Sequence, residues 1–363
     1  MNALEDLDVL ELVDATGEYC GRLLAGVGMD VVKVEPPSGA PSRHEPPFGP
    51  DGTSLRFLAD NVGKRSRVAV VDDDVRAACA DADVLVHTLR PRDAKARGLD
   101  FATLTKLNPR LVVCAITPFG QSGPWCDYEA DDLVLMALGG SMAACGYGLD
   151  DPPLAADGDQ AWRTASTYAA IAILAALLCD AGGQLIDVSA HECSASMTEW
   201  HVMTYLCTGQ PMARFSHPVI ETADGRRVAA LTPDFLGAHV FQRLREMLIA
   251  EGVAGPLADP DFDDSAYRAA HYGEVHRAIK RLAAAHTGDE LWRLGQSAGL
   301  PWGVIRSPEE VLEDRHLRSR GHWAEFDGLP YPQAPYVASA SPFTFAGPPP
   351  RLGPSGGDEG DQA

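Results

Sequence analysis

The stretch "DVLELVDATGEYCGRLLAGVGMDVVKVE", residues 8–35, decides the fold class. Residues 8–12 and 29–35 are rich in β-branched and other aliphatic side chains, which is typical of strands. The segment between them, residues 19–28, places its apolar side chains at helical spacing and ends in glycine. The stretch therefore predicts a strand, a helix and a second strand in direct succession.

The same alternation continues to residue 117. After a proline-rich loop, three more apolar runs are expected as strands and two segments as helices: strands at 66–71, 83–88 and 111–117, helices at 75–82 and 101–108. Nearly continuous apolar strands that alternate with helices are typical of a parallel sheet covered on both faces. We therefore expect a Rossmann-like α/β architecture. The chain lacks a GxGxxG motif, so nicotinamide binding is not supported.

The rest of the chain predicts a large and a small domain. A strand at 183–189 leads into one long amphipathic helix at 190–209, and an Asp-Gly turn predicts a hairpin at 221–231. Strand-like sequence returns at 300–305. We expect a large Rossmann-like domain in residues 1–209, a small α+β domain in 210–299, a return to the large domain in 300–350, and a disordered polar tail in 351–363.

Composition excludes several classes of partner. The chain has 363 residues, with 51 acidic against 30 basic side chains and a net charge of −21, which argues against binding to nucleic acid or to an anionic membrane surface. Its 8 cysteines include no CxxC pair, and its 11 histidines show no metal-ligand spacing, so we expect a reducing compartment and no metal site. No signal peptide is recognised, and the longest apolar run, 168–179, is shorter than the ~20 residues of a membrane span. These features predict a cytoplasmic protein.

Several blocks in order resemble the family III (CaiB/BaiF-type) CoA-transferases. They are "GEYCGRLLAGVGMDVVKVEPPSG" at 17–39, "NVGKRS" at 61–66, "PFGQSGPWCDYEADDLVLMALGGSM" at 118–142, "GGQLIDVSAHE" at 182–192 and "LPWGVIRSPEEVLEDRHLRSRG" at 300–321. The resemblance implies a Rossmann-like large domain, a small domain and two chains interlocked as a dimer. It also implies an enzyme that moves coenzyme A (CoA) from one carboxylic acid to another, through an aspartate that forms a mixed anhydride and then an aspartyl-CoA thioester.

The reacting aspartate of that family is missing at its usual place. In the family pattern it stands four residues before a glycine that opens a helix; here "STYAAIAILAAL" puts Ser166 at the glycine position and Trp162 at the aspartate position. An indole cannot form an anhydride. The nearest acids are Asp159, which could be a nucleophile or an N-cap of the helix, and Asp157, which reads as a turn residue. The segment "QAW", 160–162, resembles family chains that act as partner subunits.

The resemblance also implies a site for CoA, whose phosphates require cations. The candidate contacts for CoA in the matching blocks are Lys33, Asn61, Lys64, Arg65, Arg90 and Arg97. No permanently bound cofactor is expected, because CoA or acyl-CoA enters as a substrate together with a carboxylic acid.

Three functions remain open at this point. The first is a subunit of a heteromeric CoA-transferase that binds acyl-CoA without supplying the family nucleophile. The second is an active transferase, homodimeric or paired with a related chain, that uses Asp159. The third is a scaffold that stabilises a true transferase without binding CoA. The donor and acceptor acids cannot be read from the sequence.

Overall fold

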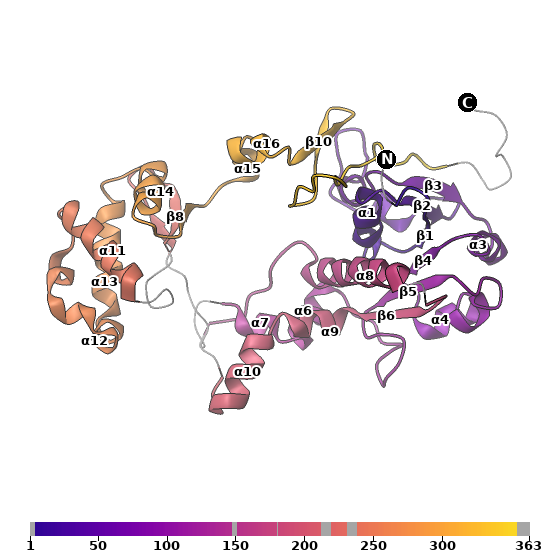
Figure 1. Cartoon of the computed structure of the whole chain (residues 1–363), viewed down its shortest axis with the longest axis horizontal. Helices are drawn as coiled ribbons and strands as arrows, with labels where there is room; N and C mark the ends of the chain where they lie inside the picture. Colours follow the sequence, from indigo (N-terminus) through magenta and orange to yellow (C-terminus); the bar gives the residue numbers. More distant parts are fainter. Residues whose placement is uncertain (1–3, 147–150, 180, 212–218, 231–237, 354–363) are drawn as a thin grey trace. The chain divides into compact units, whose positions relative to one another are not determined.

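The computed structural model describes residues 4–146, 151–179, 181–211, 219–230 and 238–353 (Figure 1). The chain divides into two compact units. The large unit holds the described residues up to 211 together with 317–353, and the small unit holds the described residues from 219 to 316. The predicted polar tail lies outside the described residues from position 354 onward.

A six-stranded parallel sheet forms the centre of the large unit. Its strands are β1 (Asp8–Leu12), β2 (Asp30–Glu35), β3 (Arg65–Val68), β4 (Val84–His87), β5 (Val112–Thr117) and β6 (Leu185–Ser189). They lie in the order β3-β2-β1-β4-β5-β6, with every neighbouring pair parallel. This is the strand order of a doubly wound Rossmann sheet. The chain adds strands toward one edge of the sheet from β1 to β3 and toward the other edge from β4 to β6, so the strand order reverses between β1 and β4. The expected α/β architecture is confirmed.

Alternating side chains of the strands build a core on each face of the sheet. On one face, Val9, Val86 and Cys114 pack with α1 (Glu18–Gly26), α6 (Asp132–Leu138), α8 (Gln160–Cys179) and α9 (Ala190–Ser196). On the other face, Leu10, Leu85 and Val113 pack with α3 (Asp72–Cys79) and α5 (Phe101–Leu104). Further helices of this unit are η1 (Pro41–His44), α2 (Leu55–Asp60), α4 (Pro91–Ala96), α7 (Ser141–Ala144), α10 (Glu199–Thr208) and α16 (Arg315–Ser319), the last of which begins at the unit boundary.

The 20-residue helix α8 is long and apolar enough to cross a membrane by length and composition. In the structure, its residues Ala161, Ala165, Ala169 and Ile173 belong to the core on the sheet, so it packs as a core helix of an α/β unit. The helix is therefore longer than the apolar run at 168–179, because residues 160–167, several of them polar, form its first turns.

The prediction of a single long helix at 190–209 is wrong. The structure has two helices there, α9 and α10, separated at Met197 and Thr198. The hydroxyl of Thr198 donates to the carbonyl oxygens of Ala195 and Gly139, so it competes for a backbone acceptor of the helix that it follows. The chain can therefore change direction at this residue.

The small unit is α+β. The predicted hairpin is confirmed as β7 (Val219–Glu221) with β8 (Arg227–Ala230), and β8 also pairs with β9 (Trp302–Val304). The helices are α11 (Ala238–Ala250), η3 (Gly255–Ala258), η4 (Pro260–Asp263), α12 (Ser265–Ala270), α13 (Tyr272–Ala283), α14 (Gly288–Ser297) and α15 (Pro308–Leu312). Because residues 302–304 pair within this sheet, the return to the large unit begins at Leu317 and not at residue 300. The hairpin β10 (Trp323–Phe326) and β11 (Leu329–Pro332) follows there.

Candidate active site

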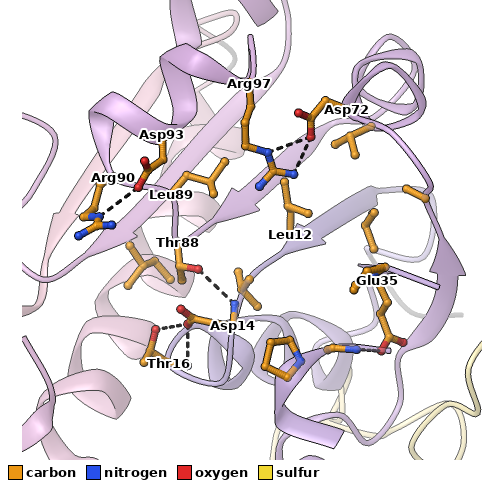
Figure 2. A pocket seen from close by; sticks show the side chains of 18 of the residues that line it. Leu12, Asp14, Thr16, Glu35, Asp72, Thr88, Leu89, Arg90, Asp93 and Arg97 are labelled. Carbon is orange, nitrogen blue, oxygen red and sulfur yellow. Dashed lines mark hydrogen bonds and ion pairs between the residues drawn. The ribbon is translucent and has the colours of Figure 1, made fainter. Parts of the chain in front are cut away.

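A cavity of about 770 Å³ opens at the carboxyl ends of the central strands (Figure 2). Its wall includes Leu12 at the end of β1, Glu35 at the end of β2, Thr88 after β4 and Pro118 after β5. It therefore straddles the point between β1 and β4 where the strand order reverses, which is where ligands bind in open α/β sheets. The volume is within the range of about 300–1,000 Å³ that is usual for small-molecule sites.

Two arginines and five carboxylates line this cavity: Arg90 and Arg97, with Asp14, Glu35, Asp72, Asp93 and Glu129. Arg90 and Arg97 flank the short helix α4 as its N-cap and C-cap residues. Each guanidinium is already bound by carboxylates. Arg97 contacts Asp72 through Nε and Nη2 at 2.8 and 2.6 Å, and Arg90 contacts Asp93 through Nε at 3.1 Å and Glu129 through Nη1.

The loop after β1 carries one of these five carboxylates, Asp14, into the cavity, as Figure 2 shows. Oδ1 of Asp14 accepts hydrogen bonds from the backbone N–H of Thr16 at 3.0 Å and from its hydroxyl. The backbone N–H of Asp14 donates to the hydroxyl of Thr88 at 3.1 Å, which ties the end of β1 to the end of β4. The two strands that flank the reversal point are therefore held at a fixed spacing.

Trp162 forms part of the cavity wall. It lies in the first turn of α8 and is only 5% exposed. It belongs to the same core as Ile116 of β5 and Ala165 of α8. The position where the sequence resemblance places a reacting aspartate is thus filled by a buried ring.

The carboxylate that caps α8 is Asp132 and not Asp159. Oδ1 of Asp132 accepts from the backbone N–H of Ala161 at 2.8 Å and from that of Trp162 at 3.4 Å. Burial raises the pKa of Asp132, and the hydrogen bonds from these backbone groups oppose the shift. The cap therefore comes from α6, far away in the sequence, which a local capping pattern cannot reveal.

Asp159 points to a different partner. Its carboxylate contacts Nη2 of Arg56 in α2 at 2.8 Å, and its backbone has a φ of 56°, in the left-handed region. The cavity wall contains Trp162 but not Asp159. The structure therefore places Asp159 in an ion pair that fastens the loop before α8 to α2.

Three of the predicted CoA contacts lie together inside the protein. Nζ of Lys64 donates to both oxygens of Glu11 at 2.8 and 2.9 Å, to the carbonyl of Glu18 at 2.7 Å and to Oδ1 of Asn61 at 2.9 Å. Nζ of Lys33 is 2.7 Å from Oε1 of Glu18, and the amide of Asn61 donates to Oε2 of Glu18 at 2.9 Å. These side chains are buried, and their donors are used within the protein.

Opposite charges stabilise the charged forms of Lys33 and Glu18 in this buried network. Burial disfavours the charged form of Lys33, but Glu11 and Glu18 outweigh it and raise the pKa of Lys33. Burial would also raise the pKa of Glu18, but Lys33 and Lys64 hold it below the ordinary value. Burial dominates for Lys64 and lowers its pKa. The network joins β1, β2, α1 and the turn before β3.

The three remaining predicted CoA contacts lie in two different places. Arg65 is exposed and pairs with Asp30 through Nε at 2.7 Å, whereas Arg90 and Arg97 line the cavity. The partners Glu11 and Glu18 were missed from the sequence. A usable signal was present, because a glutamate inside the apolar strand 8–12 requires a buried counter-charge.

Comparison with known proteins decides the family. The model of CoA-transferase family III matches residues 4–355. This chain belongs to CoA-transferase family III. It is 31% identical to the succinate–glutarate CoA-transferase of Agrobacterium fabrum, over 96% of this chain and 93% of that protein. It is 30% identical to subunit BbsE of the succinyl-CoA:(R)-benzylsuccinate CoA-transferase of Thauera aromatica, over 96% and 92%.

A solved structure agrees with this family III assignment. The crystal structure of a CaiB/BaiF family protein from Brucella suis superposes with a TM-score of 0.87 at 26% identity, covering 97% of this chain and 96% of that one. The resemblance inferred from the sequence blocks is therefore confirmed at the level of the family and of the fold.

Proposed function

We propose that this chain is the acyl-CoA-binding subunit of a heteromeric CoA-transferase, in which a related chain supplies the reacting carboxylate. One observation carries the proposal: the buried ring of Trp162 lines the cavity at the position where the family pattern has its aspartate. A carboxylate is needed there because it can act first as a nucleophile and then as a leaving group. The indole can do neither.

The cavity supports the acyl-CoA part of the proposal. It lies at the reversal point of the sheet and has two arginines at opposite ends of α4. Guanidinium groups suit phosphate oxygens because they donate two parallel hydrogen bonds. We therefore assign the anionic end of CoA to Arg90 and Arg97, and give Lys33, Asn61 and Lys64 the task of holding the strands and the turn beneath the cavity in place.

The partner is supported by the surface of the large unit and by the names of relatives. Trp200 and Leu206 on α10 are 72% and 69% exposed, which is unusual for large apolar side chains on a stable surface. Two relatives are named as subunits: BbsE, and the beta subunit of the succinyl-CoA–L-malate CoA-transferase of Chloroflexus aurantiacus, 26% identical over 85% of this chain. We propose the same kind of assembly here, in the cytoplasm, where the 8 free cysteines stay reduced.

The test compares the chain alone with the chain plus a related family chain that has the aspartate. Titration calorimetry of the isolated chain should show saturable CoA binding. Incubation of that chain with succinyl-CoA and glutarate should give no transfer and no hydroxylamine-sensitive ester. Transfer should appear with the partner, and the trapped ester should be on the partner. Absence of CoA binding would favour the scaffold alternative instead.

The same experiment decides the alternative that uses Asp159. Transfer by the isolated chain that is lost in Asp159→Asn would overturn the subunit proposal. Asparagine tolerates the positive φ of this position, so the variant removes the charge without straining the backbone. Arg56→Gln is the matched control, because it breaks the same ion pair and leaves the carboxylate present.

A further inference from the structure

The segment 127–129 contributes to the cavity wall and contacts Arg90, the arginine that we assign to a phosphate of CoA. Residues 127–129 lie against the N-terminal end of α4 through three contacts to Arg90 and Arg92. Nη1 of Arg90 contacts the Glu129 carboxylate and lies 3.5 Å from the carbonyl of Asp127, whereas the N–H of Arg92 donates to Oδ1 of Asp127 at 3.3 Å. Tyr128, between the two acids, lines the cavity.

The two ends of the Arg90–Glu129 pair differ in their environment. The Arg90 side chain is 21% exposed, and that of Glu129 is 84% exposed. A glutamate that leaves this contact keeps nearly all of its hydration, whereas Arg90 needs another anion in its place. Asp93, three residues away across the first turn of α4, stays on the Nε side of the guanidinium in either case. The Nη side is the one that exchanges partners.

We propose that Glu129 is a displaceable counter-ion that competes with a phosphate of CoA for Arg90, so that binding of CoA frees the Glu129 side chain and loosens residues 127–129, which stay attached to α4 through Asp127 and the N–H of Arg92. The proposal rests on the proposed function, since it assumes that CoA binds in this cavity. It adds Glu129 as a residue that lowers the affinity for CoA, and it predicts that CoA binds more tightly when the negative charge of Glu129 is removed. No covalent bond is made or broken; a charge-assisted hydrogen bond from Arg90 to a phosphate replaces the one from Arg90 to Glu129.

The experiment measures CoA binding to the full chain by titration calorimetry at low salt. Glu129→Gln should bind CoA about twofold to fivefold more tightly than the wild-type chain, because an exposed ion pair of this kind is worth up to about 1 kcal/mol and 1.4 kcal/mol corresponds to tenfold. The gain should shrink at high salt, which screens exposed charges. Glu325→Gln is the control, since it removes the same charge from an exposed side chain of β10 that is not part of the cavity wall.

A double-mutant cycle separates the contact from other effects of the substitution. In an Arg90→Gln background, Glu129→Gln should no longer change the affinity for CoA, because its partner is gone. Hydrogen exchange of the wild-type chain should increase at residues 127–129 when CoA is added. Glu129→Gln binding that is no tighter than wild type would overturn the proposal while leaving CoA binding intact. Failure of the wild-type chain to bind CoA would overturn the proposed function first, and this inference with it.

Discussion

At the scale of single residues, the most consequential feature is the pairing of charges inside the large unit. The side chains of Glu18 and Lys33 are both 0% exposed, and they neutralise each other at 2.7 Å. Such a pair contributes little compared with an apolar pair of equal volume, but removal of one partner leaves an uncompensated buried charge. The network should therefore tolerate single substitutions poorly.

Lys33→Met should lower the free energy of unfolding by about 3–5 kcal/mol, because it leaves Glu18 with one buried cation fewer. Denaturant unfolding followed by circular dichroism measures the change. Arg65→Met is the matched control; Arg65 is exposed, so its loss should cost at most about 1 kcal/mol. The double variant Lys33→Met, Glu18→Gln should recover part of the loss. A single variant as stable as the wild-type chain would contradict the role given to this pair.

Trp162 shows what a sequence can and cannot reveal about a site. The family pattern places Trp162 four residues before the start of a helix, whereas in the structure α8 begins at Gln160 and Trp162 lies in its first turn, in the cavity wall. The sequence indicated that Glu11 needs a buried counter-charge, but it could not identify Lys64 as one of the partners. Glu11 pairs with Lys33 in the parallel register of β1 and β2, and Nζ of Lys64 reaches the same glutamate from the turn before β3. These neighbours are set by the folded sheet and not by the local sequence.

At the scale of elements, the segment that follows β11 stabilises the edge of the sheet. The N–H of Gly63 donates to the carbonyl of Gly347, and the N–H of Gly353 donates to the hydroxyl of Ser66 in β3, both at 3.0 Å. Phe343 and Phe345 pack against Val62 in a small core of their own. Because β3 is an edge strand, this segment covers backbone that would otherwise be open to pairing with another chain.

A chain that ends after Ser341 should lose about 3–6 kcal/mol of stability, from the loss of two buried phenylalanine rings, and should aggregate more readily. Thermal unfolding and light scattering measure the two effects. A chain that ends after Gly353 keeps all of these contacts and serves as the control. Equal melting temperatures for the two truncated chains would show that the segment does not stabilise the edge.

Local patterns predicted the elements whose partners are close in the sequence. The strand–helix–strand units of the first half and the Asp-Gly hairpin appeared as expected, since periodicity and turn chemistry fix them locally. The break at Thr198 and the placement of β9 beside β8 were missed. Both depend on contacts with distant residues: Gly139 for Thr198, and Arg227–Ala230 for β9.

At the scale of the whole molecule, stability should fall in acid. The pKa of Glu18 is lowered in the folded chain; burial opposes this, but Lys33 and Lys64 outweigh it. A carboxyl whose pKa is lower in the folded state stabilises the fold above the unfolded value, here 4.5, and loses that contribution as the pH falls through the folded value. Urea unfolding should show declining stability below about pH 4.5, and Glu18→Gln should flatten the decline while lowering the plateau. An equally steep decline in that variant would assign the acid sensitivity to other groups.

Association of the whole chain should depend on α10. None of its residues is buried, and its exposed apolar side chains are Trp200, Val202, Met203, Tyr205 and Leu206. Apolar surface on this scale is stable in water when a partner covers it. Trp200→Glu with Leu206→Glu should therefore shift the chain toward the monomer and weaken its capture of a related family chain, as measured by sedimentation equilibrium and native mass spectrometry. Leu107→Glu, at a 50% exposed leucine in a loop of the large unit, is the control and should leave assembly unchanged. A doubly substituted chain that assembles as well as the control would place the partner surface elsewhere on this protein.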